Sequence, residues 1–341
     1  MRTPIGVAMA ILVACAAAYS FSPRPTPPLA ATHIAVERLQ FNTLARARAG
    51  LVAGGELGRI MLSADDGRSW QPATITPQRH ALINQIVFVS DLVGMAVGHE
   101  GWILRTDDGG RSWNELAFDA DNGAPLMSVA RLPSGRWLAV GAFGRALQSG
   151  DGGKTWAKLE LPGVEDKHLN RIVASPDRNT WLIAGEHGLV LRSADRGESW
   201  RIVPPFYNGS MYGAIALTDS HWVIHGMRGN VFHSDDGGLT WARSSLPAPI
   251  STFASARTGD DRLLLVGQGG MVLASADGGA SFQVARRGSL ATLMDIVVLA
   301  DGSWLLASDA GLKRQAPGNP PLAAAGAAAQ PVASAASGAT P

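Results

Sequence analysis

The stretch Thr106-Asp-Asp-Gly-Gly-Arg-Ser-Trp113 is one of six copies of a single pattern, Ser/Thr-x-Asp-x-Gly-x-Ser/Thr-Trp/Phe. The other copies begin at Ser63, Ser149, Ser193, Ser234 and Ser275. Their third-position aspartates lie 43, 43, 44, 41 and 41 residues apart and are Asp65, Asp108, Asp151, Asp195, Asp236 and Asp277. Copies at so constant a spacing indicate an internal repeat of about 42 residues.

The residues around each copy predict short β-strands. An apolar run leads to a Gly-x-x-Gly turn and a second apolar run, as in Met95-Ala-Val-Gly-His-Glu-Gly-Trp-Ile-Leu104. Runs of four to six apolar residues bounded by glycine turns favour strands over helices. A further run precedes each unit and another follows the tryptophan. Four short strands in about 42 residues are typical of one blade of a β-propeller.

The number of blades follows from the number of copies. Six copies mark six blades, and Leu293–Leu299 with Trp304–Ser308 repeats the first two strands of a seventh that lacks the motif. His33–Gln40 precedes the first blade, and we expect it to supply the missing strand and close the ring, because closure removes exposed strand edges. The sequence therefore predicts an all-β, seven-bladed β-propeller over residues 33–315.

The N-terminus has the pattern of an export signal. Arg2 is followed by the uncharged, apolar stretch Ile5–Tyr19, so residues 1–20 read as a signal and residues 21–32 as a Pro-rich linker. Three alternatives remain open. Leu12-Val-Ala-Cys15 resembles a lipobox, which would make Cys15 the lipidated first residue. Cleavage near Ala18 or Ala30 would release a soluble protein, and an uncleaved anchor would hold it at the membrane. In each case the body lies outside the cytoplasm, in the periplasm or at the outer face of a membrane.

Composition excludes several classes of protein. The chain has 341 residues, of which 46% are hydrophobic and 17% charged, with a net charge of +1. A core can form, and nothing supplies the basic field needed to bind nucleic acid. The only cysteine lies in the N-terminal stretch, so the body has no disulfide and no thiol nucleophile. Residues 316–341 are uncharged and rich in Ala and Pro, which predicts a flexible tail.

The repeated aspartates are predicted to be structural. A short carboxylate can bond backbone N–H groups two residues on and fix a tight turn, while glycine accepts a positive φ. The tryptophans are expected in the core between blades, with each ring N–H bonded to a carbonyl. A calcium loop is the alternative, but the terminal Glu of such a loop is absent. No metal, cofactor or catalytic residue is predicted.

The face opposite the repeated motif is the predicted partner-binding face. The residues in its Gly-x-x-Gly turns vary from blade to blade, and the innermost strands begin beside them. A ring of unlike polar groups around a channel mouth favours binding, with ordinary solvated turns as the alternative. A metal site is disfavoured because His99-Glu100 and Glu186-His187 belong to different blades. The predicted face comprises Asn84, His99, Glu100, Phe143, Arg171, Glu186, His187, Tyr212, Arg228, Gln268 and Asp295.

The six copies resemble the Asp-box of sialidase-type repeats, and the whole array is similar to the photosystem II stability and assembly factor family. That resemblance covers residues 33–315 and implies an exported, monomeric, non-catalytic scaffold that binds a membrane-protein client. Plant and cyanobacterial members of that family are lumenal propellers, and proteobacterial relatives carry the same domain. The alternative is a glycan-binding or sialidase-like propeller. Against hydrolysis, the sequence has no Arg-Ile-Pro motif, no Gly-x-Ser-x-Gly elbow, and only Tyr19, Tyr207 and Tyr212 as tyrosines.

Overall fold

The computed structural model describes residues 3–21, 35–121, 123–288 and 290–316. The chain divides into two units, Met1–Ala35 and Val36–Pro341. In the first unit, α1 (Thr3–Phe21) holds the exposed Cys15. None of the helices in the described ranges is long and apolar enough to cross a membrane. Most of the predicted linker and nearly all of the predicted tail lie outside the described residues.

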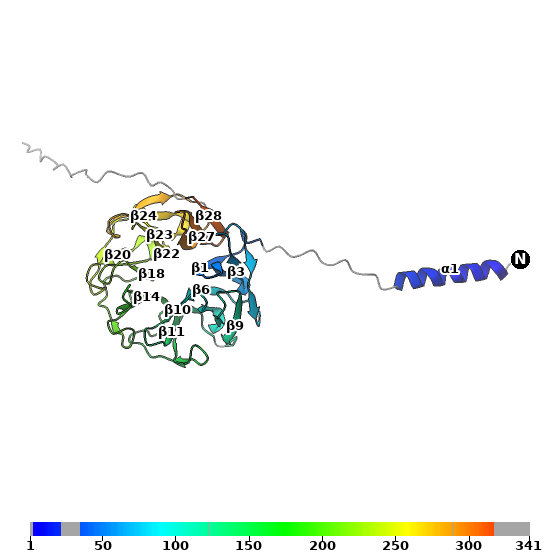
Figure 1. Cartoon of the computed structure of the whole chain (residues 1–341), viewed down its shortest axis with the longest axis horizontal. Coiled ribbons are helices and arrows are strands. Elements are labelled where there is room, and N and C mark those ends of the chain that lie inside the picture. Colours follow the sequence, from blue (N-terminus) through cyan, green and yellow to red (C-terminus); the bar gives the residue numbers. More distant parts are fainter. Residues whose placement is uncertain (1–2, 22–34, 122, 289, 317–341) are drawn as a thin grey trace, which may run out of the picture. The chain divides into compact units, whose positions relative to one another are not determined.

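The second unit is a ring of seven sheets around a central axis, which confirms the predicted propeller (Figure 1). The space around the axis, between the innermost strands, is called the channel below. Blade one contains β1 (Phe41–Ala47), β2 (Gly50–Gly55), β3 (Ile60–Ser63) and β4 (Gln71–Pro72). Blade two contains β6 (Ile83–Phe88), β7 (Gly94–Gly98), β8 (Ile103–Thr106) and β9 (Ser112–Ala117). Blade three contains β10 (Leu126–Arg131), β11 (Trp137–Gly141), β12 (Ala146–Ser149) and β13 (Ala157–Lys158).

The remaining blades repeat this inner-to-outer order. Blade four contains β14 (Leu169–Ala174), β15 (Trp181–Gly185), β16 (Val190–Ser193) and β17 (Arg201–Ile202). Blade five contains β18 (Met211–Ala216), β19 (Trp222–Gly226), β20 (Val231–Ser234) and β21 (Ala242–Arg243). Blade six contains β22 (Thr252–Arg257), β23 (Leu263–Gly267), β24 (Val272–Ser275) and β25 (Gln283–Arg286). Blade seven contains β26 (Leu293–Val298), β27 (Trp304–Ser308) and β28 (Gly311–Gln315).

Blade two has a fifth strand that the sequence did not predict. The segment leaving blade one forms β5 (Thr74–Thr76), which pairs in parallel with β9 at the outer edge of blade two. Ile75 stands opposite Trp113 in this pairing, and Phe88 meets the Trp113 ring edge-on at 6.0 Å. The added strand explains why Trp113 is fully buried.

The predicted closing strand is wrong. Within the described part of the segment, residues 36–39 form turns and bends, no residue is in a strand, and blade seven keeps three strands. A Cβ on Gly311 would lie 2.4 Å from the Cα of Glu37, so the segment crosses the tip of β28 and cannot run alongside it. It accepts one backbone bond from blade seven, from Leu312 N to the Val36 carbonyl at 3.1 Å. Closure comes from contact between β26 and β1 at the channel.

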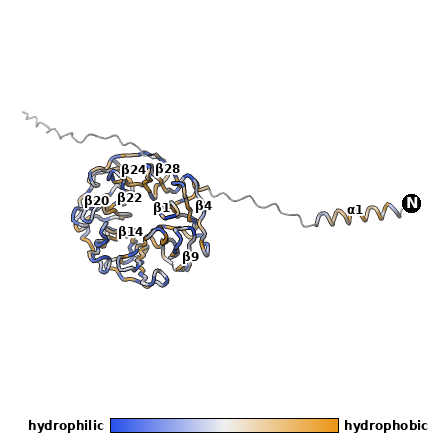
Figure 2. Tube along the Cα trace, viewed as in Figure 1, coloured by the Kyte–Doolittle hydropathy of each residue, from blue (hydrophilic) through white to orange (hydrophobic). Residues whose placement is uncertain are grey.

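The core lies between neighbouring blades and not within them. Leu138 of blade three packs in one cluster with Ile183 of blade four, and Val97 of blade two packs with Leu126 of blade three. Hydrophobic and hydrophilic stretches follow one another around the ring (Figure 2). The second strands of blades two to seven are buried at every residue, because each face of such a strand lies against a different neighbouring blade. Each blade is therefore stabilised by its neighbours.

The six copies of the repeated motif, called boxes below, are turns with one shared hydrogen-bond pattern. In blade two, Asp108 accepts bonds from the Ser112 backbone nitrogen at 3.0 Å and the Ser112 hydroxyl at 2.6 Å. Thr106 Oγ1 donates to Asp108 and accepts from Gly110 N. The carboxylate thus serves an N–H four residues on, and not the predicted two. The other five boxes repeat this pattern.

These bonds lower the pKa of every box aspartate. Hydrogen bonds from Ser199 and Ser193 lower the pKa of Asp195 to about 2, and equivalent donors lower that of Asp65 and Asp151. Partial burial raises the pKa of Asp108, Asp236 and Asp277, but the same hydrogen bonds outweigh it, and each pKa falls. The carboxylates are therefore ionised at neutral pH, and their oxygens accept hydrogen bonds within the turns.

The tryptophans divide into two groups. Trp102, Trp113, Trp137, Trp181, Trp222 and Trp304 are buried as predicted. Trp70, Trp156, Trp200 and Trp241 are only half-buried, because they follow box hairpins at outer edges that no extra strand covers. Trp113 and Trp156 donate to Gly110 and Gly153 carbonyls, whereas the buried Nε1 atoms of Trp200 and Trp241 have no hydrogen-bond partner in the described structure.

Candidate partner-binding face

Every innermost strand contains a β-bulge at its second residue. In β14, for example, Leu169 pairs with Gly185 and Arg171 pairs with Ala184, so Asn170 is left without a partner in the ladder. A bulge turns its extra side chain away from the regular alternation. The bulged residues lie beside the Gly-x-x-Gly turns, are partly exposed, and form a ring at that end of the channel: Asn42, Asn84, Met127, Asn170, Tyr212, Phe253 and Met294.

This ring has a polar arc and an apolar arc. Asn84 donates to the Leu126 carbonyl at 2.9 Å, and Asn170 donates to the Met211 carbonyl at 2.8 Å, so these amides join neighbouring blades. Blades five, six and seven carry Tyr212, Phe253 and Met294 instead. The Tyr212 and Phe253 rings lie 5.1 Å apart between centroids. One side of the channel mouth is therefore suited to apolar side chains.

The third residues of the innermost strands form a second, deeper belt. The side chains of Thr43, Gln85 and Ser128 each accept a hydrogen bond from a backbone N–H of the next blade. The donor is the fourth residue of that blade's innermost strand, and the distances are 3.1, 2.7 and 3.0 Å. Asp295 does the same for Leu44 across the joint between blades seven and one, at 2.7 Å. Blades four, five and six hold Arg171, Gly213 and Ala254 at this position, and none of these side chains can accept a hydrogen bond.

Arg171 is a half-buried cation in the channel. Among the described residues it has neither a hydrogen bond nor an ion pair. Burial raises the pKa of Asp295, and the charge of Arg171 opposes that rise. Burial, with a smaller contribution from Arg171, lowers the pKa of His225 to about 4. His225 is therefore neutral near pH 7, and Arg171 has no hydrogen bond among the described residues that binding an anion would break.

The tips of five turns carry side chains in a conformation that favours glycine. Leu57, Glu100, Phe143, His187 and Arg228 have φ between 51° and 56° and are exposed. A residue other than glycine pays roughly 1–2 kcal/mol in the left-handed region. Glycine would avoid that cost at each tip, yet five different side chains stand there, and Phe143 is 63% exposed. Strain retained for exposed, unlike side chains is typical of functional surfaces.

The structure corrects the roles of three predicted site residues. Glu186 and Gln268 accept hydrogen bonds from the backbone nitrogens of His168 and Ser251, at 3.0 and 3.1 Å. Both side chains therefore hold the residue that precedes an innermost strand. Asp295 is buried in the belt and is not presented to a partner. Glu56 and Asp309, in the corresponding turns, make the same contact as Glu186. Sequence reasoning missed this because an exposed turn carboxylate looks the same whether or not it caps a strand.

The other predicted residues lie at or near the channel mouth. His99 is half-buried, and burial lowers its pKa. Burial raises the pKa of Tyr212. Phe143 contacts His168 edge-on at 5.0 Å between ring centroids. Within the described ranges, no three His, Cys, Asp or Glu residues come close enough together to hold a metal ion.

Sequence reasoning missed Met127, Phe253, Met294 and Leu57. The first three share the bulged position with Asn84 and Tyr212, and Leu57 shares the turn tip with Glu100. An alignment of the seven innermost strands would have placed the first three in one column. The prediction favoured polar groups and kept Phe143 and Tyr212 as its only aromatic residues, so it overlooked them.

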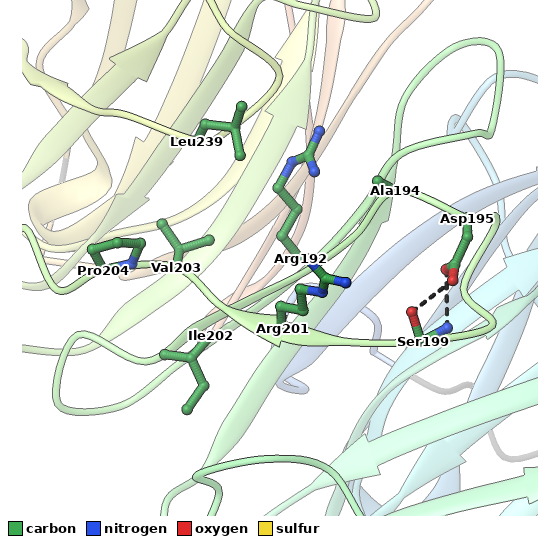
Figure 3. A pocket seen from close by; sticks show the side chains of 9 residues that line it. All are labelled: Arg192, Ala194, Asp195, Ser199, Arg201, Ile202, Val203, Pro204 and Leu239. Carbon is green, nitrogen blue, oxygen red and sulfur yellow. Dashed lines mark hydrogen bonds between the residues drawn. The ribbon is translucent and has the colours of Figure 1, made fainter.

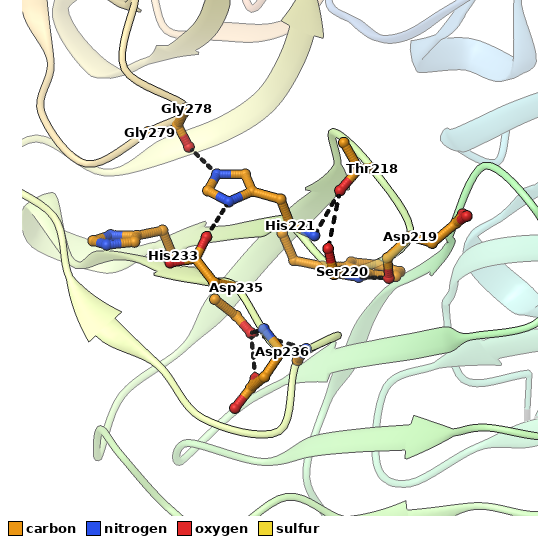
Figure 4. A network of polar contacts seen from close by, with 12 residues as sticks. Thr218, Asp219, Ser220, His221, His233, Asp235, Asp236, Gly278 and Gly279 are labelled. Carbon is orange, nitrogen blue, oxygen red and sulfur yellow. Dashed lines mark hydrogen bonds and ion pairs between the residues drawn. The ribbon is translucent and has the colours of Figure 1, made fainter.

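The opposite face carries contacts between blades. His221 of blade five bonds the Asp235 carboxylate through Nδ1 and approaches the Gly278 carbonyl of blade six through Nε2 at 2.6 Å (Figure 4). The Thr218 hydroxyl accepts a hydrogen bond from the His221 backbone nitrogen at 2.9 Å. The contact with Gly278 crosses the joint between blades five and six, whereas the bonds to Asp235 and Thr218 lie within blade five.

Comparison with known proteins concerns the fold. The sequence matches no protein-family model and no curated protein. The structure of YCF48 bound to D1 peptide superposes with a TM-score of 0.64 and 18% identity, over 85% of this chain and 96% of that one. This chain is similar in fold to YCF48.

Two further structures give the same result. YCF48 from Cyanidioschyzon merolae has a TM-score of 0.63 and 14% identity, over 82% of this chain and 95% of that one. The WD40 propeller domain of Doa1 has a TM-score of 0.61 and 14% identity, over 81% and 92%. At these identities the likeness to YCF48 and Doa1 shows a shared propeller architecture.

Proposed function

We propose that the protein is an exported, non-catalytic scaffold that binds an extended segment of a membrane-protein client at the channel mouth. The observation that carries this proposal is Arg171, a half-buried cation with no hydrogen bond or ion pair among the described residues, in the belt next to the ring that holds the apolar arc of Tyr212 and Phe253. The bound peptide in one YCF48 structure and the sequence resemblance to photosystem II assembly factors support it.

The geometry suits a segment with a carboxylate next to an apolar side chain. Arg171 would bind the carboxylate through paired N–H donors, and the guanidinium needs no rearrangement because no internal bond is broken. The apolar side chain would lie on Tyr212 and Phe253. The unlike tips Glu100, Phe143 and Arg228 would contact flanking residues of the client, which provides selectivity.

Photo-crosslinking in cells tests this proposal. A photoreactive amino acid replaces Phe143 at a turn tip or, as the matched control, Asp261 in an exposed loop at the opposite end of blade six. We expect position 143 to crosslink a membrane protein, identified by mass spectrometry, and position 261 not to. Arg171→Ala should abolish that product while leaving the melting temperature unchanged.

Three outcomes would overturn the proposal. Crosslinks confined to position 261 would move the binding surface to the box face. An unchanged product in Arg171→Ala would remove the cation from recognition. Capture of a glycan in place of a protein would favour the alternative function, in which Tyr212 and Phe253 stack on sugar rings.

A further inference from the structure

A hollow of about 400 Å³ lies at the outer edge of blade four, toward the box end (Figure 3). Two arginines line it, Arg192 from β16 and Arg201 from β17. Its apolar wall consists of Ile202, Val203, Pro204 and, from the box of blade five, Leu239. The hollow is within the size range of ligand sites, and it combines positive charge with apolar surface.

Neither arginine has a carboxylate partner among the described residues. Arg192 Nε donates to the Gly237 carbonyl at 2.7 Å, and Arg201 has no ion pair. The carboxylate of Asp195 also lines the hollow, but Ser193 and Ser199 use both of its oxygens (Figure 3). Asp195 keeps its negative charge, so the two guanidinium groups and this carboxylate leave the lining with a net charge of +1.

The equivalent arginine in blade two has a carboxylate partner that Arg192 of blade four does not have. Arg105 occupies the position of Arg192 and donates in the same way to a glycine carbonyl of the next blade, Gly152, at 2.6 Å. Arg105 also pairs with Asp107, two residues on, at 2.6 Å. The corresponding residue after Arg192 is Ala194. Blade four thus keeps the arginine and its contact with the next blade but has no internal carboxylate for it.

The apolar wall is exposed to an unusual degree. Ile202 is 47% and Leu239 is 53% exposed, and both belong to the few large apolar side chains that the described propeller leaves in water. They stand beside the arginines, so a ligand with an apolar group next to its anion would cover both surfaces at once. Burial of apolar area contributes about 25 cal/mol per Å².

The strand next to the hollow favours a peptide. β17 is the outermost strand of blade four, so one of its edges has no strand partner in the described sheet. Such an edge can pair with an added extended chain through backbone hydrogen bonds. A lipid or a simple anion could not use these groups.

We infer that this hollow binds an extended acidic peptide segment, with a Glu or Asp carboxylate on Arg192 and Arg201 and a neighbouring aliphatic side chain on Ile202. The site lies away from the channel mouth and does not depend on the proposed function. Alternating acidic and aliphatic residues suit it, because consecutive side chains of an extended chain point to opposite sides, as those of Arg201 and Ile202 do along β17.

Isothermal titration calorimetry with the full chain tests this inference. The probe is the peptide acetyl-Leu-Glu-Leu-Glu-Leu-amide, and the control peptide has Gln in place of Glu. We expect the acidic peptide to bind at least tenfold more tightly than the Gln peptide, with affinity falling as salt rises. Arg192→Gln and Arg201→Gln should each weaken binding about tenfold, which is about 1.4 kcal/mol.

Two matched variants make the test specific. Ala194→Asp should give Arg192 the internal partner that Arg105 has, and should therefore weaken peptide binding about tenfold without lowering the melting temperature. Arg105→Gln removes the equivalent arginine from blade two and should leave binding unchanged. Wild-type affinity in Ala194→Asp, or equal binding of both peptides, would overturn the inference. Displacement of the peptide by decanoate at similar concentration would overturn the peptide assignment.

Discussion

Asp295 accepts a hydrogen bond from the backbone nitrogen of Leu44 at 2.7 Å, across 251 positions of the chain. Equivalent belt contacts, such as that from Val129 N to Gln85, span 44 positions because they join consecutive blades. The Asp295 contact instead joins the last blade to the first. A side chain buried in the channel wall thus provides the closure that the sequence analysis had assigned to a strand.

The first prediction concerns this closing contact. Asp295→Ala leaves the buried Leu44 N–H without an acceptor, and we expect the free energy of unfolding to fall by about 1–3 kcal/mol in urea titrations. Asp295→Asn keeps an acceptor oxygen and should cost less. Because burial raises the folded-state pKa of Asp295, its ionisation lowers stability as pH rises through that pKa, and Asn avoids this loss. A loss in Asp295→Ala no larger than in the exposed control Asp261→Ala would contradict the closing role.

The second prediction concerns acid. The folded-state pKa of Asp195 is about 2, below its ordinary value of 3.8, because Ser199 and Ser193 donate to the carboxylate. A lowered pKa contributes stability that is present above pH 3.8 and is lost as pH falls toward 2. Asp195→Asn should therefore melt below the wild type at pH 6, and the gap should narrow between pH 4 and pH 2. A gap that stays constant over this range would assign the box another source of stability.

The third prediction compares two tryptophans. Trp113→Phe removes the bond to the Gly110 carbonyl in a fully buried site, and we expect a loss of about 1–3 kcal/mol. Trp241→Phe removes an N–H that has no partner. In the wild type the Trp241 and Phe206 rings stack with their centroids 5.4 Å apart, and a Phe ring at position 241 can keep this contact. Its loss should be smaller by about 1 kcal/mol. Thermal or urea unfolding measures both, and equal losses would count against the difference in hydrogen bonding.

The fourth prediction concerns the strained turn tips. Leu57 has a φ of 55° and is exposed, so Leu57→Gly should leave stability unchanged or raise it by up to about 1 kcal/mol. Leu92 is exposed without a positive φ, and Leu92→Gly should cost roughly 0.5–1 kcal/mol. Melting temperatures of the two variants decide the matter. A Leu57→Gly protein that melts as low as Leu92→Gly would show that the tip is not strained.

The repeat made the blades predictable, since spacing, glycine turns and apolar runs are local properties. Contacts between distant segments were not. Residues 36–40 pass over Gly311 in place of pairing, and no local pattern records that crossing. The bulge that aims Tyr212 and Phe253 depends on the register between two strands. In the sequence, Asp295 and Glu186 are both acidic residues near a turn. Only the packed structure shows that Asp295 is buried at the joint between two blades, whereas Glu186 lies in a partly exposed turn.

β5 lies in the sheet of blade two although it follows blade one in the chain. The end of the first sequence repeat is therefore not the end of a unit that unfolds cooperatively. Local opening of blade one would pull the edge strand from β9 and expose the ring of Trp113. Amides of the first two blades should accordingly exchange with solvent as one group, and a fragment cut at the repeat boundary would divide that unit.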